Sequence, residues 1–239
     1  MNIHSRRVLK SVASLVFSLA ALSQAHATFV AAICNDLACS GGDDIVIRDN
    51  GVGDSINSSG AISFATAVFG YDLAVDTAQS KPGIGSAKSP QLDLSFTATT
   101  NSAAPATLFL FASDTDFDAS GSFLLGLGGT NSGGSGTETG RAWGGTNNDE
   151  LVFSRANLFG SLGPLSGETV SSDQAGVFLS QLDPFSLTIG VAISRASAGT
   201  STGDLNLQVS AVPEPESYAL MLAGIGALGF VAKRRKVRS

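Results

Sequence analysis

Histidine is almost absent from this sequence of 239 residues. There are two, His4 and His26, and both lie in an N-terminal segment that we expect export to remove. The mature chain would then contain none. Histidine is the usual base of Ser-His-Asp and Cys-His catalysis and a common metal ligand. Its absence therefore excludes these mechanisms, and His-ligated metal sites, from the mature protein.

The N-terminal segment has the parts of a secretory signal peptide. A basic start containing Arg6, Arg7 and Lys10 precedes the short apolar run SVASLVFSLAAL, and Ala25-His26-Ala27 supplies the small residues that signal peptidase reads. We predict that residues 1–27 are a signal peptide cleaved after Ala27, with signal peptidase as a partner. The alternatives are an uncleaved N-terminal anchor and, from the paired arginines, twin-arginine export instead of Sec export.

Cationic side chains are also scarce. Residues 28–212 contain six lysines and arginines against 18 aspartates and glutamates, a net charge of −12. Such a surface repels phosphate backbones, so nucleic acid is excluded as a partner. The same charge keeps the protein soluble and attracts divalent cations or cationic partners.

The chain has only two cysteines, Cys34 and Cys39. In an exported protein a nearby pair is most simply explained by a disulfide, and this one would close a small loop. Two free thiols are the alternative. A zinc site is disfavoured because two thiolates leave the metal's shell incomplete.

A mostly apolar run without a charge lies near the C-terminus. Tyr218 to Ala232 spans 15 residues, which as a helix would rise about 22 Å against a hydrocarbon core of about 30 Å. We predict a short transmembrane helix over 218–232, preceded by a break at Pro213 and Pro215. A basic tail at 233–238 would then stay on the cytoplasmic side; its charged residues are Lys233, Arg234, Arg235, Lys236 and Arg238.

Three features follow one another over residues 212–239: the motif Val212-Pro213-Glu214-Pro215, the apolar segment and the basic tail. In this order they resemble the PEP-CTERM sorting signal of Gram-negative bacteria. The resemblance implies recognition by an exosortase, a multispanning membrane enzyme that processes such tails near the PEP motif. It also implies a bacterium that makes exopolysaccharide. An ordinary C-terminal membrane anchor is the alternative.

Residues 28–211 have the pattern of β-strands. In FSLTIGVAISRA, residues 185–196, apolar residues alternate with small or polar ones, which indicates a half-buried strand. GDLNLQVS, residues 203–210, repeats the pattern, and the small residues between the two predict a hairpin. Similar alternation at 69–75 and 92–96, with many turn residues, predicts an all-β ectodomain over 28–211. Its architecture would be a β-sandwich or jelly-roll-like fold.

Two other stretches depart from the strand pattern. Residues 147–162 are the best candidate for a short helix, with Asn148 or Asp149 as its cap. Residues 126–149 are rich in glycine and predict a mobile surface loop or a hairpin with a glycine-rich tip. Trp143 lies in this stretch. It is the one candidate for an exposed ligand-stacking residue, with a partly buried anchor for the loop as the alternative.

Asp114, Asp116 and Asp118 alternate along the sequence SDTDFDASG. Hard oxygens at this spacing suit Ca²⁺. An EF-hand loop is excluded, because Ala119 and Leu125 occupy its glycine and glutamate positions. The alternative is a solvated strand end or turn. Calcium at these aspartates is thus the only cofactor that the sequence suggests.

We therefore expect an exported protein that is not an enzyme. It would pass through the inner membrane, be held there by its tail and then reach the cell surface or the exopolysaccharide matrix of a biofilm. Its role would be structural or adhesive, through contacts with exopolysaccharide or other matrix components. The alternatives are a lectin-like carbohydrate binder and a carboxylate-based glycan hydrolase.

Overall fold

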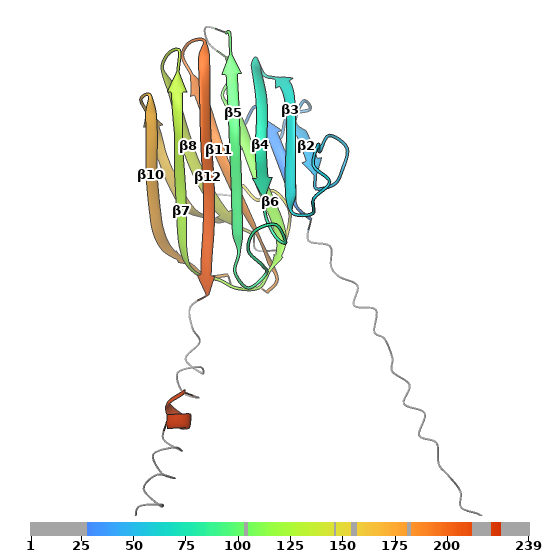
Figure 1. Cartoon of the computed structure of the whole chain (residues 1–239), viewed down its shortest axis with the longest axis vertical. Coiled ribbons are helices and arrows are strands. Elements are labelled where there is room, and N and C mark those ends of the chain that lie inside the picture. Colours follow the sequence, from blue (N-terminus) through green and yellow to red (C-terminus); the bar gives the residue numbers. More distant parts are fainter. Residues whose placement is uncertain are drawn as a thin grey trace, which may run out of the picture.

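The protein is a sandwich of two antiparallel β-sheets with six strands each (Figure 1). The computed structural model describes residues 28–102, 105–145, 147–153, 157–180, 183–211 and 221–225. The predicted signal peptide, residues 1–27, lies outside these ranges. So do most of the predicted transmembrane helix and the whole basic tail. The predictions of an all-β fold and of a sandwich are confirmed.

We call the two layers sheet I and sheet II. Sheet I has the order β2-β1-β6-β11-β8-β9, with bounds Ile45–Arg48, Val30–Cys34, Leu108–Phe117, Phe185–Arg195, Gly136–Gly144 and Leu158–Ser166. Sheet II has the order β10-β7-β12-β5-β4-β3, with bounds Thr169–Phe178, Gly121–Ser132, Gly199–Ala211, Gln91–Thr100, Tyr71–Gln79 and Ala61–Val68. From β5 onward the chain crosses to the other sheet at every step except β8 to β9.

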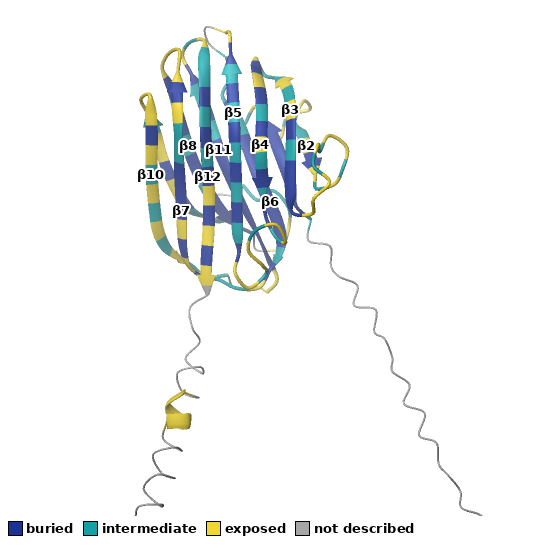
Figure 2. Cartoon of the chain, in the orientation of Figure 1, coloured by how far each residue is buried: buried dark blue, intermediate teal, exposed yellow. Residues whose placement is uncertain are grey.

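Alternation of side chains along each strand builds the core. In β5 every second residue is buried, as the striped strands of Figure 2 show. Leu92, Leu94 and Phe96 from this strand meet Ile189 and Val191 from β11 in one apolar cluster between the sheets. Each large side chain buried in this way stabilises the fold by about 1.5–3 kcal/mol. The interleaved small polar residues face the solvent, as expected of a sheet with one wet face.

The predicted hairpin between residues 185–196 and 203–210 is wrong. Both segments are strands, but β11 lies in sheet I and β12 in sheet II. The chain between them crosses the sandwich and turns at Gly199, whose φ of +148° suits only glycine. A Cβ at this position would also lie 2.2 Å from the carbonyl oxygen of Ser132.

The glycine-rich stretch at 126–149 is not a mobile loop. It contains most of β7 and all of β8, which are each second from an edge and lie in different sheets, so the stretch is not a hairpin either. Glycine is needed in these strands where neighbours approach closely. A Cβ on Gly129 would lie 2.2 Å from the carbonyl oxygen of Thr202, and one on Gly140 would lie 2.8 Å from a methyl group of Leu205.

The prediction of a short helix within residues 147–162 is also wrong for those of its residues that the structure describes. Residues 147–153 are irregular, and β9 begins at Leu158. Near the C-terminus, residues 221–225 form a short helix. Within the described ranges, no helix has the length and apolar character needed to cross a membrane.

Candidate functional site

Both ends of the sandwich domain leave it on the same side. The last residue of β12, Ala211, pairs with Gly121 at the start of β7. At the other terminus the Thr28 backbone N–H donates to Thr115 Oγ1 at 3.1 Å, close to the end of β6 at Phe117. We call this side of the molecule the tail end. It is the lower end in Figure 1.

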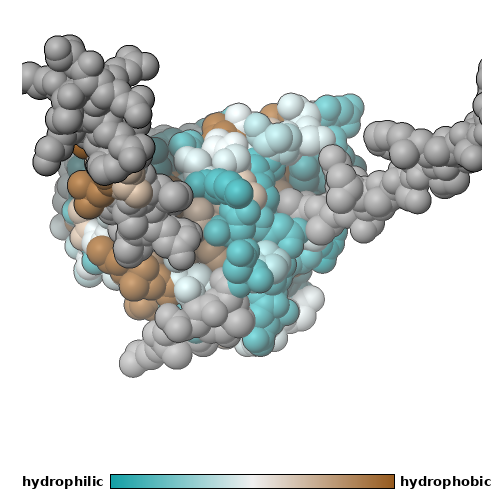
Figure 3. Space-filling model, turned by 90° about the horizontal axis from the view of Figure 1, so that it is seen from below, coloured by the Kyte–Doolittle hydropathy of each residue, from teal (hydrophilic) through white to brown (hydrophobic). Residues whose placement is uncertain are grey.

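The tail end carries apolar surface on one side, seen face-on in Figure 3. Val177, near the end of β10, and Leu179, just after it, are 62% and 63% exposed, and Leu124 of the neighbouring β7 is 46% exposed. Exposed side chains of this size are few on the described part of the domain. The motif Val212-Pro213-Glu214-Pro215 and the basic residues at 233–238 lie outside the described residues.

The predicted disulfide is confirmed. Cys34 ends β1, and Cys39 is bonded to it with a Cα–Cα distance of 5.2 Å. The loop between them is held by Asp36, whose carboxylate accepts a hydrogen bond from the Ala38 N–H at 2.7 Å. Asp44 also approaches the two sulfur atoms. Because the sulfurs are joined, they offer no thiolates to a metal here.

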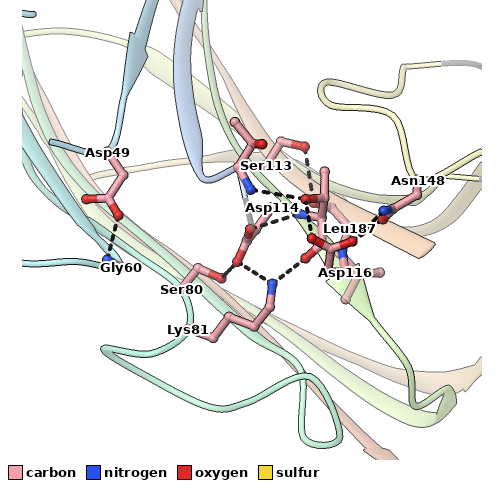
Figure 4. Close-up of polar contacts among 11 residues, drawn as sticks. Asp49, Gly60, Ser80, Lys81, Ser113, Asp114, Asp116, Asn148 and Leu187 are labelled. Atoms are coloured by element: carbon pink, nitrogen blue, oxygen red, sulfur yellow. Dashed lines mark hydrogen bonds and ion pairs between the residues drawn. The ribbon is translucent and has the colours of Figure 1, made fainter. Parts of the chain in front are cut away.

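The three aspartates predicted to bind calcium do not converge. Asp114 is fully buried, and its carboxylate accepts hydrogen bonds from Lys81 Nζ at 2.8 Å and Ser80 Oγ at 2.5 Å (Figure 4). Burial raises the pKa of Asp114, while Lys81 and Ser80 oppose the rise. A lysine thus provides the positive charge at this carboxylate. Sequence spacing gave no sign of this pair, because its members are 33 residues apart.

Asp116 and Asp118 have other surroundings. Asp116 and Asn148 form a reciprocal pair: the Asp116 N–H donates to Asn148 Oδ1 at 2.8 Å, and Asn148 Nδ2 donates to Asp116 Oδ1 at 2.7 Å. Asp118 follows β6 and is exposed. Among the described residues, the three carboxylates are not part of any common group with metal-ligand spacing.

Trp143 is not an exposed stacking residue. It is 2% exposed and packs with Phe111 and Phe153 on the outer side of sheet I. Residues 147–153 cover this aromatic cluster, and the Leu151 N–H donates to Ser113 Oγ at 3.0 Å. The buried-anchor alternative therefore describes Trp143 better.

A buried polar cluster that the sequence did not reveal lies between the sheets, toward the end opposite the tail end. Arg195 Nη1 donates to Ser201 Oγ at 2.9 Å, and Ser201 Oγ donates to Asn131 Oδ1 at 2.6 Å. Glu138 is fully buried nearby, and neither of its oxygens has a hydrogen-bond partner among the described residues. Burial raises the pKa of Glu138 to about 7, although Asn131 and Arg195 oppose the rise.

The outer side of sheet II is a second surface of interest. Its strands contain five aspartates and no lysine, arginine or histidine. We call this surface the acidic face, and its charged members are Asp72, Asp76, Asp93, Asp173 and Asp204. Burial and the neighbouring Asp204 raise the pKa of Asp93 to about 6. The alternating patterns of these strands predicted outward polar residues, but strand order was needed to gather them on one surface.

Comparison with known proteins identifies the C-terminal segment. Residues 211–236 match the PEP-CTERM protein-sorting motif. No curated protein matches the chain. Among solved structures, the enzymatically active domain of bacteriophage CBA120 tailspike protein 4 is similar, with 12% identity and a TM-score of 0.32. The match covers 60% of this chain and 18% of that one. A likeness of this degree says nothing about what the chain binds.

The matched motif confirms the resemblance seen in the sequence. The protein carries a signal for processing by an exosortase and for sorting to the cell surface. The motif begins at residue 211, which is also the last residue of β12. The sorting signal therefore follows a core strand of the sandwich without an intervening linker.

Proposed function

We propose that this protein is a non-enzymatic structural or adhesive component of the cell surface or exopolysaccharide matrix, delivered there by exosortase processing. The observation that carries the proposal is the direct passage from β12 into the sorting motif. Cleavage near the motif would release the sandwich with all twelve strands intact. The delivered part is thus a compact domain held by two sheets and a disulfide.

The carboxylates of the domain support a role without catalysis. A glycan hydrolase needs two carboxyl groups on either side of one bound substrate. Asp114 is paired with Lys81 in the interior. Asp93 lines a shallow hollow of about 310 Å³ with Gln79, Gln91 and Gln208, but the neighbouring Asp204 does not line it. The hollow therefore contains one of these two acids and not the pair.

A lectin that stacks sugars on an aromatic side chain is not supported either. Trp143, the only tryptophan, is buried under residues 147–153. Every aromatic residue in the strands of sheet II lies at an inward position of its strand. Contacts of this surface with a matrix would instead be polar and ionic.

Cell fractionation tests the proposal. In cells with the exosortase, we expect the protein in the surface or extracellular fraction. In cells lacking the enzyme, we expect it to stay with the membrane fraction. Glu214→Gln in the PEP motif should reproduce that retention, whereas Glu216→Gln, two residues further on, should be sorted normally. An unchanged distribution in the deletion strain would contradict exosortase-dependent delivery.

A further inference from the structure

The acidic face has one sign of charge over its whole width. Its five aspartates lie on the outer side of β4, β5, β10 and β12. Asp72, Asp93 and Asp204 each lie between two buried residues, and Asp76 and Asp173 are exposed. The described cations lie elsewhere. Arg195 is buried, Lys81 is largely buried against Asp114, Arg48 and Arg141 are on β2 and β8 of sheet I, and Lys88 is in the β4–β5 loop. No cation of sheet II neutralises this surface.

Two glycines of β7, Gly126 and Gly128, lie on the same side of the strand, toward the acidic face. Gly126 lies between Asn206 of β12 and Asp173 of β10 in the strand register. A Cβ on Gly126 would lie 2.9 Å from Asp173 Oδ1 and 3.1 Å from Asn206 Oδ1. Gly128, two residues along, faces open space. The Asp173 and Asn206 side chains therefore lean over Gly126 from both sides, and the surface over Gly128 is left open.

Rows of threonine hydroxyls extend the polar character of this face. Thr99 and Thr200 share a hydrogen bond of 2.9 Å, and Thr130 and Thr202 share one of 2.8 Å. Each hydroxyl has a further lone pair to offer. The face can therefore combine carboxylates, which bind ammonium groups, with hydroxyl and amide groups, which bind sugar hydroxyls.

We propose that the acidic face binds a polymer carrying protonated amines, of the kind that an amino-sugar polysaccharide with free amino groups provides. Charge complementarity is the argument, because the face has several carboxylates and no cation of its own. Ammonium groups close to Asp93 and Asp204 would relieve the repulsion that contributes to the raised pKa of Asp93. Individual exposed ion pairs are weak. A repeating polymer overcomes this by engaging several at once.

This inference rests on the proposed matrix role and names its partner class. The test uses mature protein purified from cells and a glucosamine hexamer with free amines, in mildly acidic buffer that keeps the amines protonated. The fully N-acetylated hexamer is the uncharged probe. Asp173→Asn with Asp204→Asn removes two charges from the face. Asp43→Asn with Asp118→Asn removes two exposed charges outside sheet II and serves as the matched control.

We expect calorimetry to show that only the free-amine hexamer binds and that added salt weakens the binding. The face variant should lose roughly tenfold in affinity, whereas the control variant should change little. The proposal is overturned if the acetylated hexamer binds as well, if the face variant binds normally or if both variants lose equally. The face variant should still be sorted by the exosortase, so failure here is distinguishable from failure of the proposed function.

Discussion

Lys81 and Asp114 form an ion pair inside the tail end of the sandwich, with 2.8 Å between Lys81 Nζ and Asp114 Oδ2. The Asp114 side chain is fully buried and that of Lys81 is 13% exposed. The lysine also donates to the Thr115 carbonyl oxygen and lies 4.0 Å from the centre of the Phe117 ring. The pair therefore ties the β4–β5 loop to β6 near the point where both termini leave the domain.

Lys81→Met should destabilise the domain strongly. Methionine keeps much of the apolar stem but leaves Asp114 without its charge partner, and losing one member of a buried pair costs about 3–5 kcal/mol. Urea unfolding measures this. Arg48→Met is the control, since its ion pair with Glu150 is more than half exposed at the arginine and should contribute under about 1 kcal/mol. Equal losses in the two variants would contradict this account of the pair.

Stability should fall as pH rises, because of Glu138. Its pKa is about 7 in the folded state against an ordinary value of 4.5, so the folded state holds the proton more tightly. The contribution is complete below pH 4.5 and is lost as pH rises through about 7, on the order of 2–3 kcal/mol. Glu138→Gln should remove that fall in urea unfolding series at several pH values.

The comparison for this pH series is Asp93→Asn. The pKa of Asp93 is raised from 3.8 to about 6, so its own contribution has the same sign but is lost at lower pH. The Asp93 variant should therefore keep the fall near pH 7 that the Glu138 variant lacks. A flat profile in the wild type, or an unchanged fall in Glu138→Gln, would show that the carboxyl group is not buried as described.

Trp143→Ala should destabilise the domain by about 3–5 kcal/mol, because it opens a cavity beside Phe111 and Phe153. The single tryptophan also gives a direct readout of its surroundings. Wild-type emission should be blue-shifted and resistant to soluble quenchers, and it should shift to the red on unfolding. Emission typical of an exposed indole in the native protein would restore the stacking interpretation.

Two adjacent glycines of β7 should respond differently to alanine. A Cβ on Gly129 would lie 2.2 Å from the Thr202 carbonyl oxygen, whereas one on Gly128 meets nothing within 4 Å. Gly129→Ala should therefore unfold the domain or lower its free energy of unfolding by several kcal/mol, about the upper range for single substitutions. Gly128→Ala should be tolerated. Equal tolerance at both positions would mean that β7 and β12 are not packed in this register.

The sequence predicted much of the fold because alternation is a local property. The strands at 185–195 and 203–210 were recognisable from their own residues. Their assignment to different sheets was not, since a crossing between layers and a hairpin turn use the same small residues. Gly129 and Gly140 belong to the stretch that was predicted to be a loop, because the need for glycine there depends on a strand remote in sequence. These glycines leave room for atoms of β12. The sequences of β7 and β8 alone do not show that β12 packs against them.

The features of the candidate site also divide into those that a short segment of sequence reveals and those that only the fold brings together. The sorting motif is contiguous and was recognised directly. The disulfide was also predictable, because Cys34 and Cys39 are five residues apart. Asp114 instead looked like a calcium ligand, because its partner Lys81 is remote in sequence. The acidic face needed the strand order, since residues from 72 to 204 must come together to form it.

The intact mass of the mature protein tests the central claim most directly. It should be measured for protein recovered from cells with and without the exosortase. We predict that residues 1–27 are missing in both cases and that the segment after the PEP motif is missing only when the enzyme is present. A complete C-terminal segment in both strains would mean a plain membrane anchor, and delivery to the matrix would lose its mechanism.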